Sequence, residues 1–398
     1  YMKNLILNEK KVLKDFQEHN PSQLFSNKRK LYKRYKKNFE YNYTYLFKLP
    51  LRLFNNCDLI DFGAGTGDNT LFLAEHGAKC TLVDMNPIAS KKSKNLFKFY
   101  LKKNIKNHKF YVSSIFKFKL NKKFDVVHTR GMLSHTANPK MAFKKCASFL
   151  KKGGIFIYGD PNQFGGFQNM LQRYIVYSVS KNRDEMFKNC ELLFKEDIDR
   201  SVKYSDRTRN EIIVDRWVVH RQKDPTFDDV MKWFKDSNIS LYSSYPPTNQ
   251  DMIDSHLNFP KKSLYNLQGS EAINEMKWMR KNKDDFDNVK NMIKKNQKFI
   301  NSQRLLSKIF SDMRMDTLLN KKKMSKVIKD YSNSLNYIET FENQEIHSTK
   351  IFINEVKKVL SYVEKKDLKG INRTIKKSKH LFKGNVGVRS VDYIGIKN

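Results

Sequence analysis

The feature that constrains this chain most is a short stretch in which a strand-like apolar run leads into closely spaced glycines. The apolar run surrounds one acid, Asp61. Glycines then follow at every second position, as Gly63, Gly65 and Gly67, before an amphipathic run that starts at Thr70. This order is typical of a buried strand, a tight loop and a helix whose first turn presents free N–H groups. Because glycine permits positive φ and close approach of the backbone, the stretch predicts a ligand-binding loop in an α/β fold.

A second acid follows the next apolar segment. Residues 80–84 have the pattern of another parallel strand, and this strand ends in Asp84. In open parallel sheets ligands bind at the carboxyl ends of the strands, and an acid about 20 residues past the glycines can accept hydrogen bonds from ribose hydroxyls. The two features together predict a cofactor that contains a nucleoside.

The glycine spacing excludes the usual dinucleotide loop. That fingerprint is G-x-G-x-x-G, whereas this chain has G-x-G-x-G with Asp68 near the position of the third glycine. An acid there would repel a pyrophosphate. The stretch instead resembles motif I of class I S-adenosylmethionine (SAM)-dependent methyltransferases, in which the loop passes under a cationic sulfonium and an amino-acid tail.

Three later stretches resemble the same family in the expected order. Residues 124–128 resemble its fourth strand, and residues 133–139 are similar to its "HT-x-[DN]-P" signature. Residues 150–157 resemble the "LK-x-GG" turn into its fifth strand. The resemblance covers residues 57–160 closely and residues 226–246 loosely.

The resemblance implies an α/β fold with a doubly wound, mostly parallel, seven-stranded sheet. The sixth strand is expected at residues 239–245, after a helix with Thr226 as its N-cap and Asp229 in a capping box. Residues 387–396 alternate like a strand, and we expect them to form the antiparallel seventh strand beside the sixth. Residues 251–380 would then be a helical insertion within the fold.

These patterns divide the chain into six expected parts. The first part is expected to hold two helices, the second capped by Ser22, and to cover the cofactor. The parts are an N-terminal helical arm (1–56), a SAM-binding Rossmann-like core (57–160), a substrate-covering insertion (161–225), a segment that completes the sheet (226–250), a lysine-rich helical region (251–380) and a final strand (381–398).

The resemblance assigns cofactor-binding roles to the loop and to the strand ends. Asp61 would order the glycine loop or reach the amino group of the cofactor, and Asp84 would bind the ribose. The family often has an acid after the third strand that binds the adenine amine, but this chain has Ser113 and Ser114 there, which leaves adenine recognition to a hydroxyl or to backbone groups. The further cofactor-binding candidates are Gly63, Ala64, Gly65, Gly67, Met85, Ser114, Ile115 and Thr129.

Methyl transfer requires alignment of the acceptor, exclusion of water and, for some acceptors, removal of a proton. His135 is a candidate base because imidazole titrates near neutrality, although in the family this histidine more often shapes the pocket. Asp160, at the end of the fifth strand, is a candidate for orienting an amine or hydroxyl. His128 lies within a strand and is expected to be packed. No metal site is expected.

The net charge of +36 favours nucleic acid as a partner. However, lysine provides most of this excess, as in the products of AT-rich genomes. Seven of the 16 arginines fall in residues 161–250, a segment of nearly neutral charge. They indicate either an acceptor with a carboxylate or phosphate, or ion pairs with neighbouring acids.

We therefore expect a SAM-dependent methyltransferase that modifies an O, N, S or C atom of a small molecule. The near-neutral charge of the arginine-rich segment favours ion pairs, and an anionic acceptor is the alternative. One alternative is a tRNA or rRNA methyltransferase, which would show strongly salt-dependent RNA binding. Another is a non-catalytic SAM-binding protein. Four scattered cysteines and the lack of a long apolar run indicate a cytoplasmic protein, and no pattern indicates an oligomeric state.

Overall fold

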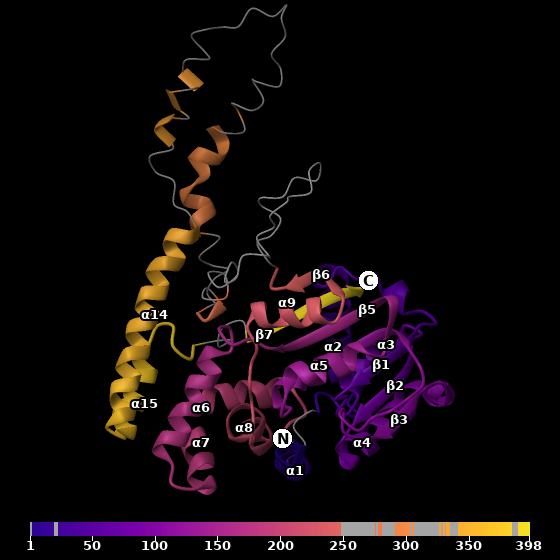
Figure 1. Ribbon diagram of the computed structural model, residues 1–398. Helices are drawn as coiled ribbons and strands as arrows, with labels where there is room; N and C mark the ends of the chain where they lie inside the picture. The colour runs from indigo at the N-terminus through magenta and orange to yellow at the C-terminus, as the bar shows by residue number, and fades with distance from the viewer. Residues whose placement is uncertain are drawn as a thin grey trace, which may run out of the picture.

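The computed structural model describes most of the chain: residues 2–19, 23–247, 275, 278–280, 291–302, 305, 326–327, 329–330, 332–334, 341–383 and 389–398. Its centre is a seven-stranded sheet in the order β3-β2-β1-β4-β5-β7-β6 (Figure 1). The strands are β1 (Asp58–Phe62), β2 (Lys79–Asp84), β3 (Lys109–Val112), β4 (Phe124–Arg130), β5 (Leu150–Pro161), β6 (Ile239–Tyr245) and β7 (Ser390–Lys397).

The last strand completes the sheet from the far end of the chain. The first five strands pair in parallel, whereas β7 pairs antiparallel with both β5 and β6. The prediction that the C-terminal tail forms an antiparallel strand beside the sixth is therefore confirmed for Ser390–Lys397; residues 387 and 388 lie outside the described residues. Consequently, the long segment between β6 and β7 is inserted within the fold.

The helices before the fifth strand form the arm and the layers beside the sheet. They are α1 (Met2–Glu18), α2 (Arg29–Tyr41), η1 (Asn42–Leu46), η2 (Leu51–Phe54), α3 (Asp68–Glu75), α4 (Pro87–Leu101), η3 (Lys102–Asn107), η4 (Leu133–His135) and α5 (Pro139–Ala147). The expected helix capped by Ser22 is wrong in its start, because residues 23–28 form bends and turns and α2 begins at Arg29; Ser22 itself lies outside the described residues.

The later helices are α6 (Phe167–Val179), α7 (Arg183–Tyr204), α8 (Arg209–Ile213), η5 (Val214–Val218), α9 (Phe227–Asp236), α14 (Phe341–Glu364) and α15 (Leu368–Lys377). The expected capping box at the start of α9 is confirmed, since the Thr226 side chain accepts from the Asp229 N–H and the Asp229 carboxylate accepts from the Thr226 N–H. The insertion predicted at 251–380 is helical in α14 and α15, and most of residues 251–340 lie outside the described residues.

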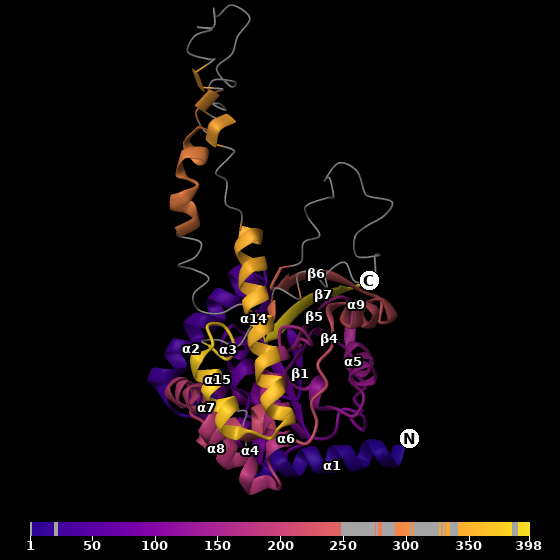
Figure 2. The ribbon, with the colours of Figure 1, turned by 90° about the vertical axis from the view of Figure 1, so that its left-hand side faces the viewer.

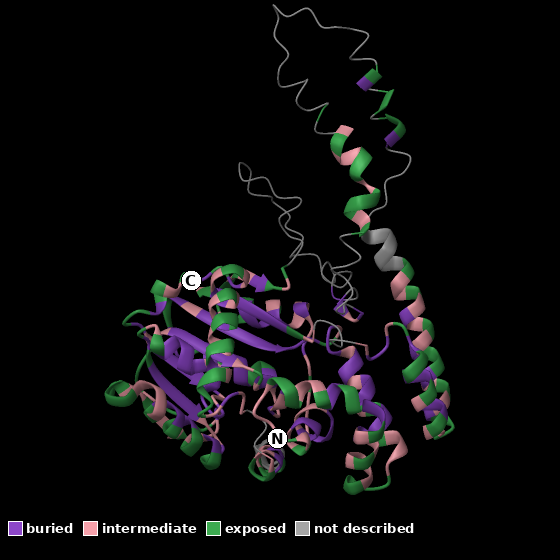
Figure 3. Ribbon diagram, turned by 180° about the vertical axis from the view of Figure 1, so that it is seen from behind, coloured by how far each residue is buried: buried purple, intermediate pink, exposed green. Residues whose placement is uncertain are grey.

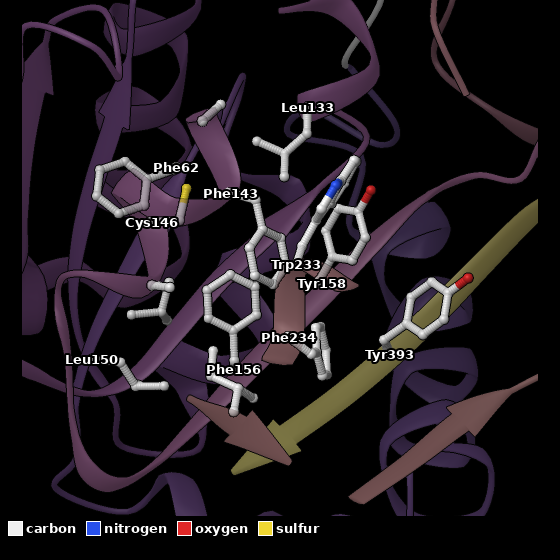
Figure 4. Packing of buried hydrophobic residues seen from close by; sticks show 14 of the residues in the cluster. Phe62, Leu133, Phe143, Cys146, Leu150, Phe156, Tyr158, Trp233, Phe234 and Tyr393 are labelled. Carbon is white, nitrogen blue, oxygen red and sulfur yellow. The ribbon is translucent and has the colours of Figure 1, made fainter. Parts of the chain in front are cut away.

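Each face of the sheet carries its own apolar core. On one face, Phe143 of α5 packs against Phe156 of β5 and Phe234 of α9, with ring centroids 4.7 and 5.4 Å apart (Figure 4). On the other face, aromatic residues of α2, η1 and α3 pack on β1 and β2. Figure 3 shows the resulting pattern, with buried strands between helices whose outward surfaces are exposed. The two cores fix the sheet and therefore the positions of its loops.

A third core lies outside the sheet and joins two segments that are far apart in sequence. Helices α14 and α15 lie beside α6 and α7 (Figure 1 and Figure 2). Side chains of α6, α7, α8 and η5 pack with side chains of α14 and α15, and Trp217 is fully buried among them. The substrate-covering insertion predicted at 161–225 thus shares a core with the described end of the lysine-rich region. Among the described residues, no helix is both long and apolar enough to cross a membrane.

Candidate functional site

A cavity of about 360 Å³ lies where β1, β2 and β4 end. The glycine loop and the residues after β2 form its floor, and α1 covers it. Residues of the 161–225 segment and the residues at the start of β7 form its far wall. The residues that define these walls are Glu9, Val12, Phe16, Gly63, Ala64, Gly65, Asp68, Asp84, Met85, Asn86, Ser113, Ile115, Arg130, Met132, His135, Arg207, Asp215 and Arg389.

The glycine loop needs glycine both for its backbone angles and for space. Gly63 has a φ of +69°, and a Cβ atom there would lie 2.3 Å from Cγ of Met132. Gly67 has a φ of +80° and lies against Ser93 of α4, outside the cavity lining. Of the predicted loop residues, Gly63, Ala64 and Gly65 therefore face the cavity, while Gly67 allows α3 and α4 to pack closely.

The Asp84 carboxylate joins the loop to the start of α4. Its Oδ2 accepts a hydrogen bond from the Gly65 N–H at 2.7 Å, and its Oδ1 accepts one from the Asn86 N–H at 2.8 Å. Burial raises the pKa of this carboxyl, while the two backbone N–H groups oppose the rise. A carboxylate has about four lone-pair directions, so acceptor capacity remains on the cavity side.

Asp61 lies behind the loop and is absent from the cavity lining. It is 2% exposed, its Oδ1 is 2.8 Å from Nδ1 of His128, and its Oδ2 accepts from the Thr70 hydroxyl. The expectation that His128 is a packed residue is confirmed, because the ring is 1% exposed. Asp61 thus connects β1, α3 and β4 beneath the loop.

Asp68 fastens the N-terminal arm to the loop. Its Oδ1 accepts hydrogen bonds from the N–H groups of Leu24 and Phe25, both at 3.1 Å, and its Oδ2 accepts from the Thr66 hydroxyl. Burial raises the pKa of this carboxyl. The sequence showed only that an acid here disfavours a pyrophosphate, and the link to the arm was missed because the partners are some 43 residues away.

Helix α1 covers the cavity and is held at several points. The buried Asp15 carboxylate accepts from Arg183 Nη1 at 2.9 Å and from the His220 N–H at 2.7 Å. The Phe16 carbonyl accepts from Asn86 Nδ2 at 3.0 Å. The helix therefore spans from the residues after β2 to the segment of residues 161–225 and covers the cavity.

His135 lines the cavity in a defined tautomer. Its Nδ1 is 2.8 Å from the carbonyl oxygen of Arg221, and because a carbonyl can only accept, the proton resides on Nδ1 and Nε2 keeps its lone pair. Burial lowers the pKa of the imidazole. The Phe16 ring meets it edge-on at 5.4 Å. The ring is therefore neutral at pH 7 and has one free acceptor nitrogen.

Asp160 lies behind η4 and is absent from the cavity lining. The side chain is buried and accepts hydrogen bonds from the N–H and the hydroxyl of Ser134, at 3.1 and 3.0 Å. Burial raises its pKa to about 7, with a contribution from the charge of Asp224. Because Asp160 binds Ser134, the neighbour of His135 in η4, its place suits the positioning of His135 better than contact with a substrate.

The pKa of Asp160 predicts a pH dependence of stability. Between about pH 4 and pH 7 the folded protein retains a proton that the unfolded chain releases, so this group stabilises the fold at low pH and that contribution is lost as pH rises. We expect Asp160→Asn to gain stability relative to wild type from pH 4 to pH 8, by up to about 4 kcal/mol, in urea unfolding. Asp236→Asn serves as the control, because pairing with Lys140 lowers the pKa of Asp236 and predicts the opposite trend. Parallel curves for wild type and Asp160→Asn would contradict the prediction.

The arginines of the 161–250 segment mainly form ion pairs with acids of the same chain. Arg209 pairs with Glu191 and Asp199, and Arg183 pairs with Asp15. Arg200 likewise pairs with Asp197, so the ion-pair alternative holds for these three residues. Arg207 differs in its location, because both Arg207 and its partner Asp215 line the cavity. The Arg207 Nη1 atom is 3.1 Å from Oδ2 of Asp215.

Arg389, just before β7, also lines the cavity and was missed from the sequence. Within the described part of the chain its side chain has no hydrogen bond or ion pair, and its Nε is buried without a partner. Asp215 lies close enough for the charges of Arg207 and Arg389 to lower its pKa. An arginine without a partner in a cavity is a candidate for binding an anionic group.

Of the remaining candidates for cofactor binding, some line the cavity and others lie behind the lining residues. Met85 and Ile115 line the cavity. Ser114 lies outside the lining and donates its hydroxyl to Glu9. Thr129 is fully buried beside the lining residue Arg130.

Comparison with known proteins agrees with this geometry. Residues 19–203 match the family model described as a methyltransferase domain. No curated protein matches the chain.

Solved structures of methyltransferases overlap the fold in part. Magnesium protoporphyrin IX methyltransferase (ChlM) from Synechocystis PCC 6803 with bound SAM is 12% identical, with a TM-score of 0.33 over 53% of this chain and 71% of that chain. PKMT2 from Rickettsia typhi is 15% identical, with a TM-score of 0.40 over 57% and 45%. A methyltransferase structure from Bacillus halodurans C-125 is 15% identical, with a TM-score of 0.31; the match covers 48% of this chain and only 65% of that chain.

The matched residues include the glycine loop, Asp84 and His135. Residues 19–203 are therefore similar to a methyltransferase domain, and the magnesium protoporphyrin IX methyltransferase structure named above holds bound SAM.

Proposed function

We propose that the chain transfers a methyl group from SAM to a small anionic acceptor within the described cavity. One observation carries the proposal: a single cavity connects the groups suited to an adenosyl cofactor, at the glycine loop and Asp84, with His135 and an unpartnered Arg389. The bound cofactor would supply a methyl group on a positively charged sulfur.

We assign the cofactor-binding role to residues between β1 and α4 and to the turn after β3. The Asp84 carboxylate would accept the ribose hydroxyls, since its two backbone contacts hold it in place and leave lone pairs free. Gly63 and Gly65 would let the backbone approach the cofactor, and Met85 and Ile115 would contact the base. Asp61, Gly67 and Thr129 would act indirectly by shaping this region.

His135 is proposed as the base. A neutral imidazole with its proton on Nδ1 can take a proton at Nε2 from an acceptor hydroxyl or amine. Asp160 is then a positioning residue, because it holds Ser134 and so fixes the turn that carries His135.

The anionic character of the acceptor is proposed from Arg389 and Arg207. A guanidinium suits carboxylate and phosphate oxygens because its N–H groups form a planar fork. Asp215 pairs with Arg207, whereas among the described residues the Arg389 side chain has no hydrogen bond or ion pair and can bind a ligand oxygen.

The test is a panel of carboxylated and phosphorylated small molecules with their neutral amides and alcohols, incubated with SAM that carries a deuterated methyl group. Mass spectrometry would detect the labelled product. We expect Arg389→Gln to raise the KM of the anionic acceptor by about tenfold or more, since a hydrogen bond to a charged group contributes roughly 1.5–3 kcal/mol. Its control is Arg209→Gln, an arginine of the internal ion pairs. Labelling of neutral compounds only, or an unchanged KM in Arg389→Gln, would contradict an anionic acceptor.

A further inference from the structure

The adenine end of the cavity has no acid from the strands that form it. From residue 85 to residue 124 the sequence contains no aspartate or glutamate. The turn after β3 offers Ser113 and Ser114, followed by Ile115. The exocyclic amine of adenine donates hydrogen bonds, so a site selective for adenine needs an acceptor near this turn.

Helix α1 brings a carboxylate to this end. Glu9 lines the cavity, and its Oε1 accepts a hydrogen bond from the Ser114 hydroxyl. Among the described residues, Oε2 of Glu9 has no hydrogen-bond or ion-pair partner. One oxygen is thus fixed by the turn after β3, and the other retains its acceptor capacity.

The surroundings of Glu9 suit a flat ring. Val12 follows it by three residues on α1, so both side chains lie on the same face of the helix, and Val12 is 2% exposed. Met85, Ala89 and Ile115 line the same cavity from the loop after β2, from α4 and from the turn after β3. Asp84 ends β2 immediately before Met85, which places the proposed ribose site next to this apolar slot.

We propose that Glu9 recognises the 6-amino group of the adenine through its free carboxylate oxygen. This inference rests on the proposed use of SAM and deepens it. The acid comes from the covering helix and not from the sheet, so the same contact that selects the base also holds α1 over the cavity. Cofactor binding and closure by α1 are therefore coupled, together with the existing contacts of Asp15 and Phe16.

The test compares S-adenosylhomocysteine with S-inosylhomocysteine, which carries an oxygen in place of the 6-amino group. Isothermal titration gives the Kd of each ligand for wild type, Glu9→Gln and Glu18→Gln. We expect wild type to bind the adenosyl ligand at least about tenfold more tightly, because the inosyl oxygen would face the carboxylate. Glu9→Gln should lose most of this discrimination, since an amide can donate to the oxygen as well as accept from an amine.

Glu18→Gln is the matched control because it makes the same change on the same helix at a residue outside the cavity lining. It should retain the wild-type ratio of the two Kd values. Thermal unfolding of both variants checks that they fold. An unchanged ratio in Glu9→Gln would overturn the role of Glu9 while leaving SAM as cofactor. Failure of wild type to bind either ligand would overturn both.

Hydrogen exchange provides a second test, which measures the coupling between cofactor binding and the closure of the cavity by α1. S-adenosylhomocysteine should slow the exchange of α1 amides in wild type by several-fold, and saturating ligand should slow it clearly less in Glu9→Gln. Equal protection of α1 in both proteins at saturation would show that Glu9 does not connect the base to the helix.

Discussion

Asp84→Asn is expected to weaken the binding of S-adenosylhomocysteine by about 100-fold or more. In wild type the carboxylate accepts from two backbone N–H groups, of Gly65 and Asn86, and would accept from the ribose as well. An asparagine has one acceptor oxygen only. Its NH₂ group is a donor and would therefore face one of the groups that donate to the wild-type carboxylate, either a backbone N–H or a ribose hydroxyl. Hydrogen bonds to a charged group contribute roughly 1.5–3 kcal/mol each, and at least one of them would be lost together with the loop geometry. Isothermal titration measures the effect.

The control for this experiment is Asp125→Asn. Asp125 is partly exposed, pairs with Lys151 at 2.8 Å and accepts from the Asp58 N–H at 2.8 Å, near the start of β4 and so at the opposite end of the strands from the cavity. Its replacement should leave the Kd within about twofold of wild type. If a folded Asp84→Asn protein bound the ligand nearly as well as wild type, the ribose assignment would be wrong.

His135→Gln is expected to lower kcat by about 10²–10⁴-fold with little change in the Kd of S-adenosylhomocysteine. This is the range that a positioned base contributes, and glutamine cannot accept a proton. Because burial lowers the pKa of His135, the wild-type kcat should rise with pH through a midpoint below 6.5 and be constant near neutrality. Initial rates between pH 5 and 8, with an acceptor found in the panel above, give both quantities.

The matched control is His76→Gln, a histidine at the end of α3 outside the cavity lining. It should retain the wild-type rate and pH profile. If His135→Gln kept its kcat and the acidic limb of the profile, the histidine would only shape the pocket.

Local patterns in the sequence were sufficient to predict much of the sheet. The predicted sixth strand matches β6 (Ile239–Tyr245), and the capping box at Thr226 starts α9 as expected. Both depend on residues within a few positions of each other. The place of β7 was also predicted, because its alternating pattern was the remaining candidate for the strand that the family resemblance requires.

The cover of the cavity could not be predicted in the same way. Glu9 and Ser114 are 105 residues apart, and nothing in the amphipathic pattern of α1 distinguishes Glu9 from Glu18. Arg389 could not be assigned either, because its position depends on where β7 joins the sheet. Contacts between distant segments depend on packing, which periodicity does not describe.

Asp68 illustrates the same limit within the best-recognised motif. The spacing of the glycines identified the loop, and the acid in it was taken as evidence about charge in the ligand. In the structure this acid binds the N–H groups of Leu24 and Phe25 and so attaches the arm. A residue in a motif can thus serve the fold as well as the ligand.

A crystal structure of the protein with S-adenosylhomocysteine would test the central claim most directly. We expect both ribose hydroxyls within about 3 Å of the Asp84 carboxylate oxygens, the loop of Gly63 and Gly65 against the amino-acid tail, and the 6-amino nitrogen beside Glu9. A ligand bound away from Gly65 and Asp84, or none at saturating concentration, would contradict it.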